Sequence, residues 1–193
     1  MGSEVIKRIA VFCGSAKGND IAFVQDCLNL AGSLCANNIS LVYGGGNVGL
    51  MGVLADEMLR LGGEAIGVIP RKLVEIEVAH SGLTKLHIVT GMHERKALMA
   101  SLADAFIVLP GGIGTMEEFF EIYTWLQLEY HSKPIAISNV NGFYDGLITF
   151  LRHLVEQQFV KAAQFERLII RDNSVQLINN ILNYYPGQVS ITS

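Results

Sequence analysis

The segment Pro110–Glu118 (PGGIGTMEE) combines residue types that bind a phosphate group with residue types that can act on the molecule attached to it. It follows the apolar run 105–109 and precedes a helical pattern over 117–128, which indicates a glycine loop between a strand and a helix. The first backbone N–H groups of a helix have no partner within it, and the helix dipole is positive there, so that end favours an anion. Glycines let the backbone approach the anion closely, and the Thr115 hydroxyl can donate to it or cap the helix. We therefore expect a phosphate site in this segment.

Two carboxylates close the segment and point to a second role beside phosphate binding. Because phosphate repels a carboxylate, we expect at least one of Glu117 and Glu118 to face something else. Residues three apart share a helix face, so Thr115 and Glu118 can meet the same ligand. Glu117 points about 100° away from Glu118 around the helix axis.

The elements that must position these residues follow from the alternation of short apolar runs with helical patterns along the whole chain. The sequence predicts strands at 9–12, 40–43, 65–69, 86–89, 105–109, 135–138 and 168–170. It predicts helices at 20–37, before the glycines at 62–63, and at 93–102, 117–128, 144–156 and 175–184. Near-continuous apolar strands alternating with helices predict an α/β fold, a Rossmann-like three-layer sandwich with a mostly parallel sheet covered by helices on both faces. We expect residues 1–193 to form a single nucleotide-binding domain.

In such sheets, ligands bind beyond the carboxyl ends of the strands. Three loops with glycines belong at that edge, at 14–15, 44–49 and 111–114, and they could line one cleft. The Ser15 hydroxyl can donate to phosphate there. The spacing of glycines in 44–49 also fits a dinucleotide fingerprint, but the next strand ends without the acid that would hold the ribose hydroxyls. A single nucleotide spread over several loops therefore fits better.

Composition narrows the classes of partner. The net charge is −4 without a cluster of Lys and Arg, which argues against nucleic acid or an anionic membrane and favours a small-molecule substrate. No apolar run approaches the roughly 18 residues of a membrane span, and the start of the chain lacks a signal-peptide core, so we expect a cytoplasmic protein. The three cysteines lack C-x-x-C spacing, which predicts buried thiols and no disulfide or zinc site.

Two segments carry a resemblance to a known family. Pro110–Glu118 matches the P-G-G-x-G-T-x-x-E motif of the Lonely Guy family of cytokinin riboside 5′-monophosphate phosphoribohydrolases, and 92–96 (MHERK) resembles its companion motif. Segments 12–15 and 43–52 are also similar, so the resemblance covers about residues 8 to 185. Many members were labelled lysine decarboxylases, but we expect no pyridoxal phosphate chemistry, since Lys96 shows no sign of an apolar Schiff-base pocket.

The resemblance implies hydrolysis of the N-glycosidic bond of N6-substituted adenosine 5′-monophosphates to free base and ribose 5-phosphate, with no cofactor and no metal. This reaction builds positive charge on the ribose ring oxygen and anomeric carbon, so a fixed carboxylate stabilises the transition state and can orient water. Glu118 is our choice for that carboxylate. Arg95 opens a helix at the same sheet edge, its guanidinium offers a planar fork for phosphate or base, and the resemblance makes it catalytic with Glu118.

The resemblance also implies that Lys96, Glu117 and Glu77 touch the substrate, Glu117 at the ribose hydroxyls. Each has a plainer explanation: a solvated lysine, a first-turn acid that favours the helix dipole, and a charged loop residue. Thr124, two turns beyond Glu117, could equally cap or pack. The complete set of expected substrate contacts is Ser15, Gly45, Gly46, Glu77, Met92, Lys96, Gly111, Gly112, Ile113, Gly114, Thr115, Met116, Glu117 and Thr124.

Some alternatives stay open. A non-catalytic nucleotide or cofactor carrier on the same fold would need the same glycine loops. Tyr123, Leu126 and Tyr130, with Trp125 alongside, have the spacing of a core stripe, and part of this stripe could form a homodimer face, since similar family members pair through helices. Met51, Met92 and Met99 could line an apolar wall against the base or simply pack in the core. The preferred base does not follow from the sequence.

Overall fold

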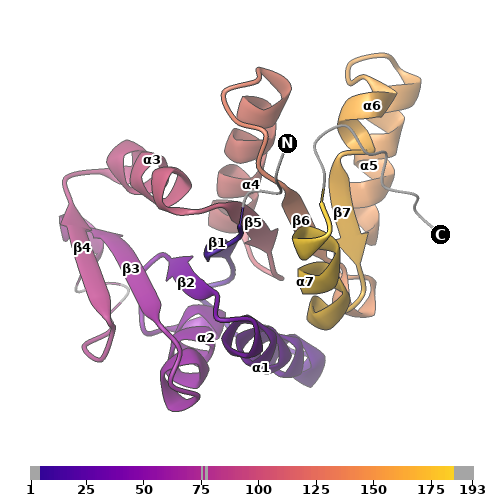
Figure 1. The fold of residues 1–193 in the computed structure, drawn as a ribbon. Helices are drawn as coiled ribbons and strands as arrows, with labels where there is room; N and C mark the ends of the chain where they lie inside the picture. The colour runs from indigo at the N-terminus through magenta and orange to yellow at the C-terminus, as the bar shows by residue number, and fades with distance from the viewer. Residues whose placement is uncertain (1–4, 75, 77, 185–193) are drawn as a thin grey trace.

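The computed structural model describes residues 5–74, 76 and 78–184, which form a single seven-stranded sheet with helices on both faces (Figure 1). The strands are β1 (Arg8–Phe12), β2 (Ser40–Tyr43), β3 (Ala65–Pro70), β4 (Lys85–Val89), β5 (Ala105–Val108), β6 (Ile135–Ser138) and β7 (Leu168–Arg171). Their order across the sheet is β4-β3-β2-β1-β5-β6-β7, and every neighbouring pair is parallel. The predicted strands are confirmed to within one residue at each end.

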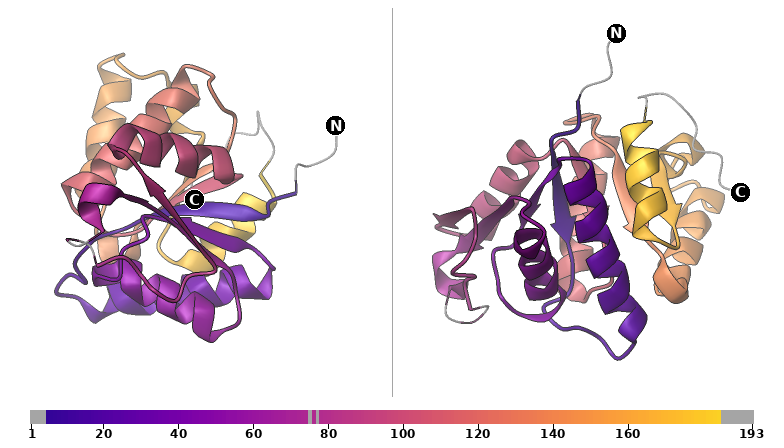
Figure 2. Two further views of the ribbon diagram at one scale, coloured as in Figure 1. Left: turned by 90° about the vertical axis from the view of Figure 1, so that its left-hand side faces the viewer. Right: turned by 60° about the horizontal axis from the view of Figure 1, so that its bottom comes forward.

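The helices form the two outer layers of the sandwich (Figure 2). They are α1 (Ile21–Ala36), α2 (Gly49–Arg60), α3 (Met92–Leu102), α4 (Ile113–Gln127), α5 (Asp145–Glu156), α6 (Ala162–Phe165) and α7 (Ser174–Leu182), with 3₁₀ turns η1 (Arg71–Leu73) and η2 (Val140–Gly142). One hydrophobic cluster joins the sheet to α1, α2 and α7, and a second joins it to α3, α4 and α5. The predicted three-layer α/β sandwich is confirmed.

Helix ends follow local chemistry, with one correction. Asp20, at the start of the helix predicted over 20–37, caps α1, its carboxylate accepting from the Ala22 N–H at 2.9 Å, and Gly62 follows α2 in the left-handed conformation with φ +78°. The helix expected from residue 117 begins instead at Ile113, with Gly112 as its N-cap. Glycine is well tolerated at an N-cap, so the loop glycines do not delay the helix as the sequence pattern indicated.

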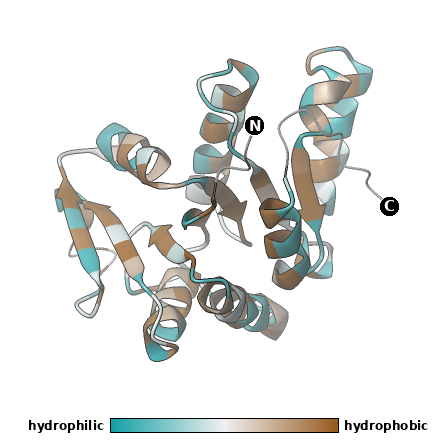
Figure 3. Ribbon diagram, in the orientation of Figure 1, coloured by the Kyte–Doolittle hydropathy of each residue, from teal (hydrophilic) through white to brown (hydrophobic). Residues whose placement is uncertain are grey.

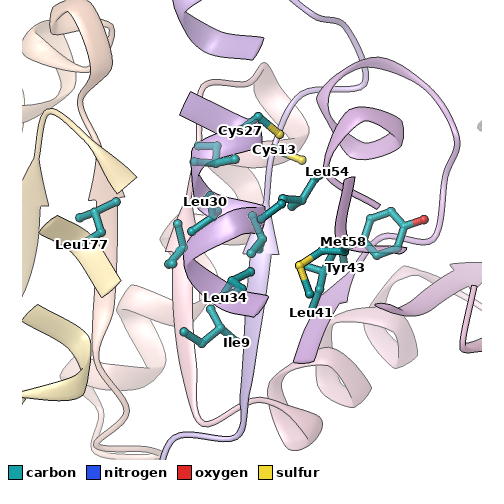
Figure 4. Close-up of a cluster of buried hydrophobic side chains, with 14 of the residues drawn as sticks. Ile9, Cys13, Cys27, Leu30, Leu34, Leu41, Tyr43, Leu54, Met58 and Leu177 are labelled. Atoms are coloured by element: carbon teal, nitrogen blue, oxygen red, sulfur yellow. The ribbon is translucent and has the colours of Figure 1, made fainter. Parts of the chain in front are cut away.

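Side chains along each strand alternate between the two clusters, because successive residues of a strand point to opposite faces. In β1, Ile9 and Val11 pack with α1, α2 and α7, whereas Ala10 and Phe12 pack on the other face. Figure 4 shows part of the first cluster, in which Leu30 and Leu34 of α1 lie beside the strands, and Figure 3 shows apolar residues concentrated along the sheet. The sheet is thus a rigid base for the loops at its carboxyl edge.

None of the helices in the described part of the chain is long and apolar enough to cross a membrane. Cys13, Cys27 and Cys35 are free thiols; Cys13 and Cys27 are buried as predicted, whereas Cys35, near the end of α1, is only partly buried, so the prediction was wrong there. Within residues 5–74, 76 and 78–184, no group of three or more His, Cys, Asp or Glu side chains could hold a metal ion.

A buried carboxylate ties α1 to β6 and α7. Asp26 accepts hydrogen bonds from the Ser138 hydroxyl at 2.6 Å, the Ser174 hydroxyl at 2.7 Å and the Ser174 backbone N–H at 2.9 Å. Ser174 is the first residue of α7, so the negative charge also lies at the positive end of that helix. All three side chains are buried, which makes this cluster a polar anchor within an otherwise apolar interface.

Replacing this carboxylate is expected to cost much of the stability of the protein. The Asp26→Ala variant leaves the Ser138 hydroxyl and the Ser174 backbone N–H buried without their acceptor, whereas the Ser174 hydroxyl can still donate to the backbone carbonyl of residue 26 at 2.9 Å. Each group that loses its acceptor costs about 1–3 kcal/mol. We expect the free energy of unfolding to fall by about 3–5 kcal/mol, measured as a lower urea midpoint with an unchanged m-value. Glu156→Ala, which removes an exposed carboxylate from α5, should change it by less than about 0.5 kcal/mol. A loss below about 1 kcal/mol for Asp26→Ala would contradict the anchor.

Candidate active site

The three glycine-containing loops lie side by side at the carboxyl edge of the sheet, because β2, β1 and β5 are neighbours. The loop after β1 is hydrogen-bonded to both of the others. The Gly14 N–H donates to the Pro110 carbonyl at 3.0 Å, and the Leu50 N–H donates to the Gly14 carbonyl at 3.0 Å. The edge where β1 meets β5 is also the point at which the strand order reverses, the usual ligand position in such sheets.

The loop from Pro110 to Gly112 leads directly into α4. Its N-cap, Gly112, has no side chain that could accept a hydrogen bond from the first-turn N–H groups. These groups point toward the sheet edge, as an anion site requires. Thr115 is buried and folds back over Gly111: a Cβ added to Gly111 would lie 2.1 Å from the Thr115 hydroxyl oxygen. Thr115 thus lies inside the first turn of α4. Of the two roles that the sequence allowed for its hydroxyl, capping the helix is therefore excluded, because Gly112 is the N-cap.

Arg95 reaches from α3 to the end of β2. Its side chain is only 4% exposed, and Nη2 donates to the Gly44 carbonyl at 3.1 Å. A Cβ added to Gly44 would lie 2.0 Å from Nη2 and 3.1 Å from the Met51 sulfur. Nη1 also lies 3.8 Å from the Met92 sulfur. A methyl group at position 44 would therefore displace the Arg95 guanidinium from its place against Gly44.

Arg95 on α3 and Glu118 on α4 both lie near enough to Cys13, the residue after β1, for their charges to act on its thiol. Burial raises the pKa of this thiol well above its ordinary value, and the nearby Cys27 and the Glu118 carboxylate raise it further, whereas Arg95 lowers it. A single side chain thus senses the positive charge from α3 and the negative charge from α4. Both members of the predicted catalytic pair therefore lie near the end of β1, and their catalytic role stays a prediction.

Lys96, the neighbour of Arg95, joins α3 to α4. Its side chain is 6% exposed, and its ammonium donates to Glu117 and lies 3.1 Å from a carboxylate oxygen of Glu121. Burial lowers the pKa of Lys96, but the two carboxylates raise it more, so the group stays charged with a pKa above its ordinary value. The nucleotide contacts expected of Lys96 and Glu117 stay predictions, since in this structure the two side chains bind each other.

Glu121 was missed by the sequence reasoning. It lies four residues after Glu117, which places both carboxylates on the same side of α4 facing Lys96. That spacing was the signal that could have revealed it.

The loop after β2 is held by a segment that follows β3. Gly46 forms an antiparallel bridge with Ala79, the Asn47 N–H donates to the Val78 carbonyl at 2.9 Å, and the His80 N–H donates to the Gly45 carbonyl at 2.9 Å. Gly45 and Gly46 are both buried, with Gly45 in the left-handed conformation at φ +78°. Glu77, which was expected to touch the substrate, lies outside the described residues.

The other residues that were expected to contact the substrate lie after β1, at the start of α3 or in the first turn of α4. Ser15 is exposed just after β1, Met92 is exposed at the first residue of α3, and Ile113 is 88% exposed at the first residue of α4, all at the carboxyl edge. Met116, one turn into α4, is partly buried against the second cluster. Gly114 is exposed in the first turn of α4.

Thr124 does not join the loops. It lies roughly 14 Å along α4 from Thr115, and its hydroxyl donates to the Phe120 carbonyl of the same helix at 2.7 Å. Met99 is fully buried, which is explained by core packing.

The aromatic stripe on α4 is only partly a core stripe. Tyr123 and Leu126 are buried as its spacing predicted, but Tyr130 is 76% exposed. Of the two explanations left open for the stripe, core packing does not hold at Tyr130, because α4 ends at Gln127 and Glu129 turns the chain with φ +62°, and the homodimer face stays a prediction. Helical spacing therefore does not extend to that residue.

Comparison with known proteins shows which sequences and folds this chain resembles. A protein-family model described as "Possible lysine decarboxylase" matches residues 51–181. A cytokinin riboside 5′-monophosphate phosphoribohydrolase of Rhodococcoides fascians is 46% identical, over 85% of this chain and 83% of that protein. The Arabidopsis thaliana protein of the same name, LOG2, is 43% identical over 93% of this chain and 84% of its own. Among solved structures, the molybdenum cofactor binding protein from Rippkaea orientalis has a TM-score of 0.69 at 18% identity, covering 93% of this chain and 99% of that one, and so shares its fold.

Proposed function

The chain belongs to the Lonely Guy family of cytokinin riboside 5′-monophosphate phosphoribohydrolases, and on this basis we propose that it hydrolyses N6-substituted adenosine 5′-monophosphates. Water cleaves the bond between the base nitrogen and the anomeric carbon, giving the free base, a cytokinin, and ribose 5-phosphate. The observation that carries the proposal is the position of Arg95 and Glu118 on two helices that begin at the carboxyl edge of the sheet, where the charges of both act on Cys13.

In this proposal, the 5′-phosphate of the substrate binds at the start of α4. The first-turn N–H groups and the helix dipole favour the anion, and Gly111 and Gly112 allow the backbone to approach it. Glu118 lies three residues after Thr115 on the same side of the helix, so a nucleotide held by its phosphate presents its sugar toward this carboxylate. Phosphate binding thereby orients the bond that breaks.

Glu118 supplies the negative charge that the reaction needs. As the bond to the base lengthens, positive charge develops on the ring oxygen and anomeric carbon, and a fixed carboxylate stabilises it and orients the attacking water. The guanidinium of Arg95 donates to the Gly44 carbonyl, which holds its positive charge in position for the phosphate or the base. The chemistry as proposed uses only side chains and water.

Lysine decarboxylation, the activity in the description of the family model, does not suit Lys96. A lysine that forms a Schiff base must be neutral to attack a carbonyl carbon. Burial lowers the pKa of Lys96, but its bonds to Glu117 and Glu121 raise it above the ordinary value, which keeps the ammonium charged. Lys96 is therefore better explained as a link between α3 and α4.

A non-catalytic carrier is the alternative. The solved structures named as molybdenum cofactor carriers share the fold at 14–16% identity, whereas the curated phosphoribohydrolases are 38–46% identical. A carrier also gains nothing from a carboxylate near an anionic ligand, because the repulsion weakens binding without any benefit to chemistry. Glu118 therefore favours the enzyme.

Incubation with nucleotides tests this proposal. AMP, GMP, CMP and isopentenyladenosine 5′-monophosphate are each incubated with the protein, and free base and ribose 5-phosphate are separated by chromatography. We expect equal amounts of both products from at least the adenine nucleotides, and the panel identifies the preferred base. Binding without release of base would support the carrier instead.

We also expect a homodimer that uses the outer surface of α3 and α4. Leu128 and Tyr130 are exposed at the end of α4, and a hollow of about 460 Å³ between α3 and this end is lined by Ala97, Ala100, Ser101, Phe106, Trp125, Tyr130, His131 and Lys133. Small residues on α3 opposite aromatic residues suit the insertion of a large side chain. Size-exclusion chromatography with light scattering at micromolar protein should give twice the mass of one chain.

The doubly substituted Leu128→Glu, Tyr130→Asp protein should shift toward the monomer, because burying either carboxylate in an apolar contact is costly. Lys161→Ala, on the exposed connection after α5, should stay dimeric. A wild-type monomer would contradict the dimer.

The single domain over residues 1–193 and the cytoplasmic location also stay predictions.

A further inference from the structure

A buried tyrosine outside the glycine loop holds the start of that loop. Tyr144 directly precedes α5, and in the sequence β6 separates it from the glycine loop. Its hydroxyl donates to the Leu109 carbonyl at 2.7 Å. Leu109 is the residue immediately before Pro110. The tyrosine is buried and does not belong to the predicted site.

Three hydrogen bonds hold the backbone of Leu109 and Pro110, and of these three the bond from Tyr144 is the one made by a side chain. Since proline has no N–H, these two residues have only three backbone hydrogen-bonding groups. The Leu109 N–H donates to the Phe12 carbonyl at 2.9 Å, and the Pro110 carbonyl accepts from the Gly14 N–H at 3.0 Å. The third group, the Leu109 carbonyl, accepts from Tyr144.

Tyr144 is itself fixed in place. Its backbone N–H donates to the Asn139 side-chain oxygen at 2.7 Å, and its ring packs edge-on against Phe143 with 4.7 Å between ring centroids. Burial raises the pKa of the Tyr144 hydroxyl above its ordinary value, and the neighbouring Cys13 raises it further, so the hydroxyl keeps its proton and remains a donor. The loop is thus restrained by a rigid group.

We propose that Tyr144 is a positioning residue for phosphate binding, which holds Leu109 so that the loop into α4 keeps the backbone geometry that receives the 5′-phosphate. The inference rests on the proposed function, because it assigns the phosphate to this loop. Without the hydroxyl, the buried carbonyl loses its donor and the loop gains conformational freedom. The ligand must then order the loop when it binds, which weakens binding and leaves the chemical step largely unchanged.

The Tyr144→Phe variant tests this role because it removes one oxygen atom and retains the packed ring. We expect KM for isopentenyladenosine 5′-monophosphate to rise by about three- to tenfold, with kcat within about twofold of wild type. The dissociation constant of ribose 5-phosphate, measured by calorimetry, should rise by the same factor as KM. Tyr123→Phe is the matched control, since that tyrosine is equally buried but lies roughly 12 Å along α4 from Thr115, and its KM should stay at the wild-type value.

Three results separate the inference from the proposed function. A Tyr144→Phe protein with a lower melting temperature but unchanged KM and ribose 5-phosphate affinity would overturn the positioning role. Equal rises in KM for both tyrosine variants would overturn it as well. If the wild-type protein binds ribose 5-phosphate but releases no base, the proposed reaction fails, and the calorimetric comparison of Tyr144→Phe with wild type still decides the role of Tyr144.

Discussion

The Glu118→Gln protein is expected to lose about a thousandfold or more in kcat for release of free base. The substitution keeps the size of the side chain and removes its negative charge, so the developing positive charge at the anomeric carbon is no longer stabilised. Phosphate binding depends on the backbone amides at the start of α4 and not on this carboxylate. The dissociation constant of ribose 5-phosphate should therefore stay the same or fall slightly, because a repulsive charge has been removed.

Single-turnover assays of base release together with calorimetry on ribose 5-phosphate measure both quantities. Glu129→Gln is the matched control, since it removes an exposed carboxylate just beyond the end of α4 and should leave kcat unchanged. A Glu118→Gln protein with wild-type turnover would remove Glu118 from the catalytic role and would require another group to stabilise the sugar cation.

The Gly44→Ala substitution should reduce kcat/KM by about a hundredfold, although the residue itself performs no chemistry. The added methyl group would lie 2.0 Å from Nη2 of Arg95, too close for the guanidinium to keep its position. Gly44 is not among the glycines with positive φ, so alanine meets no backbone strain there and the clash with Arg95 is the main effect. Displacement of a catalytic group by about 1 Å is enough for a loss of this size.

Steady-state kinetics and thermal unfolding of the Gly44→Ala protein check this expectation. Gly32→Ala is the control, because a Cβ at that position in α1 meets nothing within 4 Å, and alanine should raise helix stability slightly without changing kcat/KM. If Gly44→Ala retained full activity, Arg95 would have to be able to work from a different position, and its rigid placement would not matter.

Much of the fold follows from local patterns. Apolar runs such as 105–109 are short, bounded by glycine or charge, and buried on both faces, so their positions are fixed by burial alone. The position of Arg95 and Glu118 at one edge of the sheet was also predictable in outline. Each belongs to a helix that begins at the carboxyl edge of the same parallel sheet, and topology brings such helix starts together.

What the sequence did not reveal are contacts set by side-chain direction across long separations. Lys96 could face solvent, substrate or α4, and only the packing of α3 against α4 selects Glu117 and Glu121. The bond from Tyr144 to Leu109 spans 35 positions and has no spacing rule. The start of α4 was misplaced because glycine in an isolated pattern indicates a loop, whereas at an N-cap it also suits a helix.

The central place of β1 has a consequence for how the protein is made. Ile9 pairs with Leu41 on one side and with Ala105 on the other, so the sheet is completed only when a distant part of the chain returns to its first strand. Closing so large a loop is slow compared with forming local contacts. During synthesis, the segment through β4 can assemble early. Until β5 emerges, however, β1, which is central in the finished sheet, keeps one edge unpaired. We therefore expect the edge that carries the glycine loops to be complete only after β5 has paired with β1.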